Sequence, residues 1–318
     1  MRRLLLVRLS AFGDVIHALP VAENAALAGA EVGWVVEAAF RGVLEGNPHC
    51  ARLFTADTRA WRRAPFSAAT RQAVRRLRAE LRAFAPDLSL DIQGLFKSAF
   101  VARWAGAPVV GFAASARRES ASALLCRVRV TPGPDARHVV DKNLALLGAA
   151  EVPVKVRRPD ARYLLEGPSP DADAFVAALP RPYAVFHPGA GRADKAWSEE
   201  RLARLAAALH ERRGLTPVIS WGPGDAARVD RIAALVPPAR RAPLLDARGL
   251  ARLGAGAALF VGGDTGPTHL ADALGVPTLA LFGPTDPERN GPYGDRRGIV
   301  RDMTRVTDAE ALSLAESL

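Results

Sequence analysis

Residues 259–282, LFVGGDTGPTHLADALGVPTLALF, hold a complete strand–helix–strand unit and decide the fold class. The apolar run Leu259–Val261 predicts a buried strand, which ends in a glycine turn. Pro267–Leu274 predicts a helix, because proline suits the first helical position. Pro277–Phe282 predicts a second buried strand. A strand, a helix and a strand in this order indicate an α/β fold with a mostly parallel sheet.

The same alternation of strands and helices runs through both halves of the chain. Predicted strands in the first half are Leu4–Val7, Val32–Val36, Arg52–Thr55, Leu88–Ile92 and Val109–Phe112. Predicted strands in the second half are Tyr183–Phe186, Pro217–Ser220, Leu244–Leu245, Leu259–Val261 and Pro277–Phe282. Between them, the proline-rich segment Glu151–Pro182 is the best linker candidate. We therefore predict two doubly wound α/β domains, residues 1–155 and 156–318.

Two predicted helices in the first half carry further information. Asp14–Ala28 contains Pro20, which indicates a kink or a later start of the helix. Arg71–Phe84 is amphipathic, with an apolar stripe and with arginines 71, 75, 78 and 82 off that stripe.

The 318-residue chain has a formal net charge of +10, and the whole excess lies in its first half. Residues 1–160 hold 24 basic and 14 acidic side chains, whereas residues 161–318 hold 19 of each. Within residues 52–82 there are nine arginines and two acids. This asymmetry predicts an anionic partner for the first half only. A nucleic acid, an anionic membrane surface and a merely solvated basic face all fit it.

Cysteines and apolar runs exclude several classes of protein. Cys50 and Cys126 make neither a zinc-ligand spacing nor a CxxC motif, so a disulfide scaffold is excluded and a reducing compartment fits. No apolar run reaches the ~18–20 residues of a membrane span. Arg8 and Asp14 interrupt the apolar start, which argues against a secretion signal. We expect a cytoplasmic protein.

Three loops follow predicted strands and lead into helices, at the sheet edge where ligands bind in such folds. In the first, Gly13 permits a close backbone approach, and Asp14 is either a helix cap or a carboxylate that faces a ligand. Its single glycine argues against a dinucleotide fingerprint. The second, HPGAGRADKAWS at residues 187–198, is glycine-rich and brings Lys195 to a helix start. Such a loop favours an anion site.

The third loop, GGDTGP at residues 262–267, joins the strand and the helix of the central unit. Backbone amides near Thr265 and Gly266 would face a phosphate at the start of the helix. His269 lies one turn later, and it is either a satisfied buried histidine or a site residue.

The motifs resemble those of the ADP-heptose:lipopolysaccharide heptosyltransferases. GDVIHALP (13–20), DIQGLFKSA (91–99), ADKAW (193–197) and DTGPTHLADALGVPTLALFGPTDP (264–287) occur in the family's order. The resemblance implies the GT-B architecture, two Rossmann-like domains that face each other across a cleft. It assigns the acceptor and the catalytic base to residues 1–155 and the ADP-sugar to residues 156–318. The terminal helix is then a candidate to pack back on the N-terminal domain.

The resemblance also implies roles for single residues. Asp14 matches the general base that deprotonates the acceptor hydroxyl. Donor-site positions are matched by Lys195, Asp264, Thr265, Gly266, His269, Gly189, Asp225 (the ribose) and Leu245 (the adenine pocket). Basic acceptor-side positions are matched by Arg59, Arg62, Arg63, Lys97 and Arg117.

The implied reaction is an inverting, metal-independent transfer of heptose from ADP-heptose to the Kdo region of lipopolysaccharide, without a cofactor. GLFKSAF and SARRESAS resemble the first heptosyltransferase, whereas Ala190 and Gly191 replace a pair of threonines of that enzyme. A heptosyltransferase II-like or other ADP-sugar transferase therefore stays open. So do a nucleotide-sugar epimerase of this architecture and, more remotely, a nucleic-acid-binding protein. With a lipid-linked acceptor, the basic half is expected to contact the anionic inner face of the cytoplasmic membrane peripherally.

Overall fold

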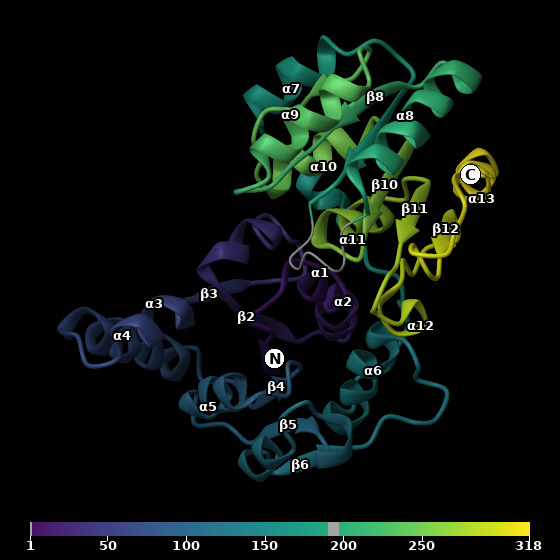
Figure 1. Cartoon of the computed structure of the whole chain (residues 1–318). Coiled ribbons are helices and arrows are strands. Elements are labelled where there is room, and N and C mark those ends of the chain that lie inside the picture. Colours follow the sequence, from purple (N-terminus) through teal and green to yellow (C-terminus); the bar gives the residue numbers. More distant parts are fainter. Residues whose placement is uncertain (1, 190–196) are drawn as a thin grey trace. The chain divides into compact units, whose positions relative to one another are not determined.

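A computed structural model describes residues 2–189 and 197–318 (Figure 1). It divides the chain into two units, unit 1 from Met1 to Pro159 and unit 2 from Asp160 to Leu318. The division falls inside the proline-rich segment, a few residues after the predicted boundary.

Unit 1 is built on a parallel sheet of six strands in the order β3-β2-β1-β4-β5-β6 (Figure 1). Its strands are β1 (Arg3–Val7), β2 (Glu31–Glu37), β3 (Arg52–Ala56), β4 (Leu88–Asp91), β5 (Val109–Phe112) and β6 (Val128–Val130). The central strands are buried almost throughout, as is typical of parallel strands covered on both faces. The strand order reverses between β1 and β4, so the ligand crevice is expected at the carboxyl ends of these two strands.

The helices of unit 1 differ from the prediction at the first loop. They are α1 (Phe12–Ile16), α2 (Leu19–Leu27), α3 (Thr58–Arg63), α4 (Ala68–Phe84), α5 (Phe96–Trp104) and α6 (Val139–Ala145). The later start that Pro20 indicated is confirmed, since α2 begins at Leu19 with Pro20 in its first turn, whereas residues 14–16 belong to a separate short helix, α1. The predicted amphipathic helix is α4, which buries Leu77, Leu81 and Phe84. The Phe84 ring contacts Phe54 of β3 at a centroid distance of 5.5 Å, which fixes α4 on the sheet.

Unit 2 repeats this topology, in the order β12-β11-β10-β7-β8-β9. Its strands are β7 (Tyr183–His187), β8 (Thr216–Ile219), β9 (Arg240–Arg241), β10 (Leu259–Gly263), β11 (Thr278–Leu281) and β12 (Arg297–Val300). The predicted strand Leu244–Leu245 is wrong, since the chain pairs with β8 through Arg240 and Arg241 instead. The order reverses between β7 and β10, which sets the ligand crevice of this unit.

The helices of unit 2 are α7 (Pro170–Ala177), α8 (Glu199–Arg213), α9 (Ala226–Leu235), α10 (Ala247–Ala255), α11 (Gly266–Ala273), α12 (Pro287–Asn290) and α13 (Asp308–Glu316). Ser198 caps α8 by accepting a hydrogen bond from the Arg201 amide. The terminal helix α13 contributes Ala311, Leu312 and Ala315 to a core that it shares with α8. No helix in the described part of the chain is long and apolar enough to cross a membrane.

Candidate functional site

Asp14 lies in α1, just after β1, and is held by a buried arginine. Its Oδ1 is 2.5 Å from Nη2 of Arg8, and its Oδ2 accepts a hydrogen bond from the Ala11 amide at 3.0 Å. Arg8 also donates from Nη1 to the carbonyl of Ile92, at the end of β4, at 3.0 Å. The Asp14 side chain keeps 38% of its surface exposed. Ala11 is the N-cap residue of α1, and the Asp14 side chain helps to cap this helix by accepting from the Ala11 amide, while it remains a positioned and accessible carboxylate.

Arg8 was not predicted as a site residue from the sequence. The available signal was its place directly after the first buried strand, at the edge where ligands bind. A second link ties the same two loops together, because Gln93 accepts a hydrogen bond from the Leu9 amide at 2.9 Å and donates to Ser10 Oγ at 3.2 Å. The loop after β1 is thus joined to the chain after β4 by hydrogen bonds of both Arg8 and Gln93.

Beside this crevice, unit 1 has a basic pocket of about 640 Å³. It is lined by Ser10, Thr58, Arg59, Arg62, Leu95, Phe96, Lys97, Arg118 and Glu119. Three of the five predicted acceptor residues, Arg59, Arg62 and Lys97, meet here. Arg63 is exposed on the same helix and does not line the pocket. Four cations against one carboxylate suit an anionic ligand.

Two carboxylates position Arg59 and Arg62 by forming hydrogen bonds at the start of α3. Asp57 accepts a hydrogen bond from the Ala60 amide at 3.0 Å. Glu37, which is buried, accepts from the Arg59 amide at 3.0 Å and from Thr58 Oγ1 at 2.8 Å. Acidic groups at a helix start are stabilising. The helix α3 was not predicted from the sequence, although Asp57 was an available capping signal.

Arg117 is a correction to the predicted acceptor site. Its guanidinium has no exposed surface and lies 3.1 Å from the Asp91 carboxylate, which has none either. It also donates to Ser122 Oγ at 2.9 Å. Burial raises the pKa of Asp91, although Arg117 and hydrogen bonds oppose that effect. Arg117 therefore fastens the chain after β5 to the end of β4, and its exposed neighbour Arg118 lines the pocket instead.

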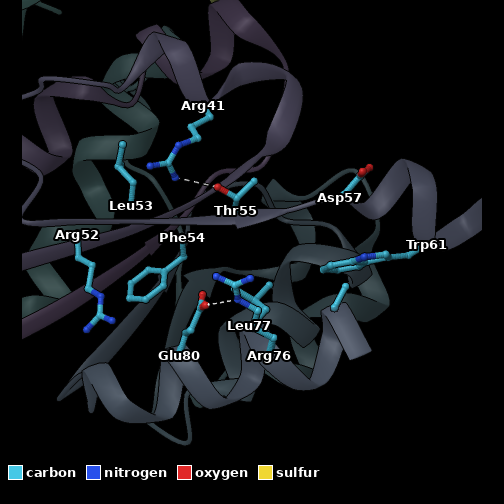
Figure 2. A pocket seen from close by; sticks show the side chains of 11 residues that line it. Arg41, Arg52, Leu53, Phe54, Thr55, Asp57, Trp61, Arg76, Leu77 and Glu80 are labelled. Carbon is cyan, nitrogen blue, oxygen red and sulfur yellow. Dashed lines mark hydrogen bonds and ion pairs between the residues drawn. The ribbon is translucent and has the colours of Figure 1, made fainter. Parts of the chain in front are cut away.

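A second hollow of unit 1, about 550 Å³, runs along β3 at the edge of the sheet (Figure 2). Its three arginines have local partners. Arg41 donates to Thr55 Oγ1 at 2.9 Å, Arg76 donates to Glu80 at 2.8 Å, and the Arg52 guanidinium lies 5.3 Å from the centroid of the Phe54 ring. It contains none of the predicted site residues.

In unit 2, Gly189 and Asp225 come together beside a buried histidine. A methyl group on Gly189 would lie 2.6 Å from Oδ2 of Asp225 and 2.9 Å from Nε2 of His187, so a larger residue would force one of these side chains to move. His187 ends β7, and its Nδ1 lies 3.0 Å from Ser220 Oγ, just after β8. Burial lowers the pKa of His187 to about 4, with a contribution from the Arg228 charge, so the ring is neutral. No role was predicted for His187 from the sequence. Lys195 lies outside the described residues.

The glycine-rich turn after β10 forms the start of α11. Thr268 Oγ1 donates to the Gly263 carbonyl at 2.7 Å and lies 3.2 Å from Thr265 Oγ1. His269 Nε2 lies 3.2 Å from Asp264 Oδ1, and both side chains are largely buried. The structure thus joins the predicted residues Asp264, Thr265, Gly266 and His269 around one helix start, which is suited to an anion.

Two further side chains border this region of unit 2. Asp272, on α11, accepts hydrogen bonds from the amides of Tyr293 at 2.6 Å and Gly294 at 3.0 Å, and burial raises its pKa. Asp272 thus joins the loop before β12 to α11.

Leu245 packs, partly buried, on the core that contains Val218. Its place in an adenine pocket stays a prediction.

The described residues contain no group of three or more His, Cys, Asp and Glu side chains arranged to hold a metal ion.

Comparison with known proteins identifies the family of the chain. The model of glycosyltransferase family 9 (heptosyltransferase) matches residues 74–314. Lipopolysaccharide heptosyltransferase 1 of Pseudomonas aeruginosa is 37% identical over 298 residues, which cover 92% of this chain and 81% of that protein.

Among solved structures, E. coli heptosyltransferase WaaC with ADP has a TM-score of 0.84 and 29% identity, over 99% of both chains. The same enzyme with ADP-2-deoxy-2-fluoro heptose has a TM-score of 0.82 and 29% identity, also over 99% of both chains. These likenesses and the two parallel sheets confirm the predicted GT-B fold. The chain belongs to glycosyltransferase family 9, the heptosyltransferases.

Proposed function

We propose that the protein transfers a heptose from ADP-heptose to the Kdo-bearing inner core of lipopolysaccharide. The observation that carries this proposal is the 37% identity to lipopolysaccharide heptosyltransferase 1 of P. aeruginosa along 92% of the chain. The solved E. coli enzyme binds an ADP-heptose analogue, and this supports the same class of donor. The relation favours the first heptosyltransferase over the second and over an epimerase or a nucleic-acid-binding protein.

The donor belongs to unit 2 in this proposal. The diphosphate is held by backbone amides at the start of α11 and by Lys195. The carboxylate of Asp225 suits a ribose hydroxyl, because a carboxylate accepts a hydrogen bond from a hydroxyl and repels a phosphate. Asp264 fixes the ring of His269 beside that helix start, at 3.2 Å. His187 stays neutral and so adds no charge near Gly189.

Catalysis begins with Asp14 as the general base. Its carboxylate takes the proton of the acceptor hydroxyl, and the oxygen attacks the anomeric carbon of the heptose. The bond from that carbon to the ADP oxygen breaks, ADP leaves with the electron pair, and the configuration at the anomeric carbon is inverted. Lys195 and the α11 amides stabilise the charge on ADP, so no metal or cofactor enters the reaction. Arg8 keeps the carboxylate in place through its 2.5 Å contact.

The acceptor belongs to unit 1. The Kdo carboxylates suit the pocket of Arg59, Arg62, Lys97 and Arg118, since guanidinium groups bind carboxylates with two parallel hydrogen bonds. The acceptor is lipid-linked, so the enzyme works at the inner face of the cytoplasmic membrane as a peripheral protein.

A mass-spectrometric transfer assay tests the proposal. ADP-heptose is offered with Kdo-lipid A or with an already heptosylated core, with and without EDTA. We expect one heptose on Kdo-lipid A, none on the heptosylated core, and no effect of EDTA. Transfer to the heptosylated core alone would assign the second heptosyltransferase reaction, and donor turnover without an acceptor would assign an epimerase.

Adjacent arginines give a matched pair for the acceptor pocket. Arg62→Ala removes a lining cation, whereas Arg63→Ala removes an exposed cation outside the pocket. We expect Arg62→Ala to raise the KM for Kdo-lipid A roughly 10-fold or more, the scale of a charge-assisted hydrogen bond. Equal effects of both variants would contradict the pocket assignment. For the donor, Lys195→Ala should weaken ADP binding by ~1.5–3 kcal/mol in calorimetry.

A further inference from the structure

The outer face of α4 carries a stripe of four arginines. Arg71, Arg75, Arg78 and Arg82 are all exposed, and their spacing of four, three and four residues puts them on one side of this 17-residue helix. At 1.5 Å per residue the stripe is about 16 Å long. We call these four residues the arginine stripe.

The other sides of α4 are already occupied. Leu77 and Leu81 are buried in the core of unit 1. Arg76 and Glu80 pair with each other at 2.8 Å and face the hollow along β3 (Figure 2). Glu80 is the only acidic residue between Thr58 and Pro86, so the helix offers the stripe no other carboxylate. Among the described residues, no ion pair involves Arg75, Arg78 or Arg82.

Phe66 extends the stripe with an apolar group. It lies just before α4 and is 88% exposed. Its carbonyl accepts a hydrogen bond from Arg71 Nη1 at 2.5 Å, which keeps the start of the stripe beside it. A large exposed aromatic side chain next to a row of cations is typical of segments that lie in a membrane interface.

We propose that the arginine stripe and Phe66 form a docking face for an anionic phospholipid surface. The guanidinium groups bind lipid phosphates, and the Phe66 ring enters the headgroup region. The inference rests on the proposed function, because a lipid-linked acceptor brings the enzyme to such a surface. The proposal also gives the arginines of unit 1 two separate tasks: Arg59 and Arg62 line the acceptor pocket, and the arginine stripe binds the membrane surface.

Vesicle co-sedimentation tests the docking face without any substrate. The triple variant Arg75→Gln, Arg78→Gln and Arg82→Gln changes the stripe and keeps residues that favour helices. The matched control, Arg127→Gln, Arg240→Gln and Arg296→Gln, removes the same charge at exposed sites elsewhere. On vesicles of phosphatidylcholine with phosphatidylglycerol, we expect binding of the stripe variant to fall roughly 100-fold and that of the control to stay within about threefold.

Phe66→Ser tests the apolar contact separately, since an 88% exposed side chain can be replaced without disturbing the core. We expect its binding to fall roughly 10-fold. The proposal would be overturned if wild-type binding did not depend on the phosphatidylglycerol content of the vesicles. It would also be overturned if the stripe variant and the control lost vesicle binding to the same extent. Stripe-dependent binding of duplex DNA or RNA by a protein that ignores the vesicles would overturn it in favour of a nucleic acid.

A transfer assay separates this inference from the proposed function. The stripe variant should transfer heptose to a deacylated Kdo acceptor in solution at the wild-type rate. It should transfer at least about tenfold more slowly to Kdo-lipid A in anionic vesicles. Wild-type rates on the vesicles would refute the docking face and leave the enzyme activity intact. Failure of the wild type to transfer heptose at all would refute the proposed function. The sedimentation assay needs no substrate, so it would still test the docking face.

Discussion

Replacing Gly189 by alanine tests how unit 2 builds its donor site. The added methyl group would lie 2.6 Å from Oδ2 of Asp225 and 2.9 Å from Nε2 of His187. Both distances are too short for nonbonded atoms, so at least one side chain has to move. His187 is 6% exposed, and its ring is 3.0 Å from Ser220 Oγ. The Asp225 carboxylate, at the end of a rotatable side chain, has more freedom to turn away.

The expected loss of stability depends on how freely the Asp225 side chain can rotate compared with the buried His187 ring. Overpacking a buried site costs about 1–3 kcal/mol, and rotation of Asp225 relieves part of it, so we expect the unfolding free energy to fall by about 1–2 kcal/mol. The rotated carboxylate leaves the position proposed for the ribose. Loss of a hydrogen bond to a charged group weakens binding by about 1.5–3 kcal/mol, which is roughly 10- to 150-fold in the Kd for ADP.

Calorimetric titration with ADP and urea unfolding measure the two effects. The matched control is Gly254→Ala on α10, where the methyl group would meet only Leu274 Cδ1, at an ordinary 3.7 Å. The control should bind ADP normally and gain about 0.5–1 kcal/mol of stability from better helix propensity. Wild-type ADP affinity in Gly189→Ala would refute the reasoning, because displacement of the Asp225 carboxylate would then not weaken donor binding.

Three further predictions concern the catalytic base and two buried groups. Asp14→Asn keeps an acceptor for the Ala11 amide and removes the base, so turnover should fall at least ~100-fold in the transfer assay while calorimetric ADP affinity is unchanged. Arg117→Met leaves the buried Asp91 carboxylate without its cation and should lower the urea-derived unfolding free energy by about 3–5 kcal/mol, whereas the exposed neighbour Arg118→Met should change it by less than about 0.5 kcal/mol. The pKa of His187 is lowered from 6.5 to about 4 in the folded protein, so the stability it contributes is present above pH 6.5 and is lost as the pH falls toward 4. That loss is on the order of 3 kcal/mol. In His187→Gln the unfolding free energy should therefore depend less on pH in this range than in the wild type, and the same pH dependence in both proteins would contradict the assignment.

The fold class could be read from the sequence because the central strands are buried on both faces. Runs such as Leu4–Val7 and Leu259–Val261 are continuously apolar, and this is the strongest local signal of a parallel sheet. The three strands that were not predicted, β6, β9 and β12, all lie at sheet edges. Edge strands keep part of their surface exposed, and β9 consists of two exposed arginines, so their hydrophobicity carries little information.

The candidate site was predictable where its residues are neighbours in sequence. Asp264 and His269 are five residues apart, and a strand, a glycine turn and a helix bring them together without help from the rest of the chain. Arg117 and Arg118 show the opposite case. Both are charged and adjacent, and nothing local decides which one pairs with Asp91 and which one lines the pocket.

The amino-acid sequence by itself determined the alternation of strands and helices, the positions of the ligand-binding loops and the one-sided charge. These properties depend on local hydrophobic periodicity and composition, which a short window of the chain contains. Only the tertiary structure decided that Arg8 holds Asp14, that Gly189 lies against Asp225 and His187, and that Arg118 rather than Arg117 lines the basic pocket. Each of these facts joins side chains through the packing of separate elements, and burial alone turns identical arginines into an internal anchor, a pocket wall or an exposed face.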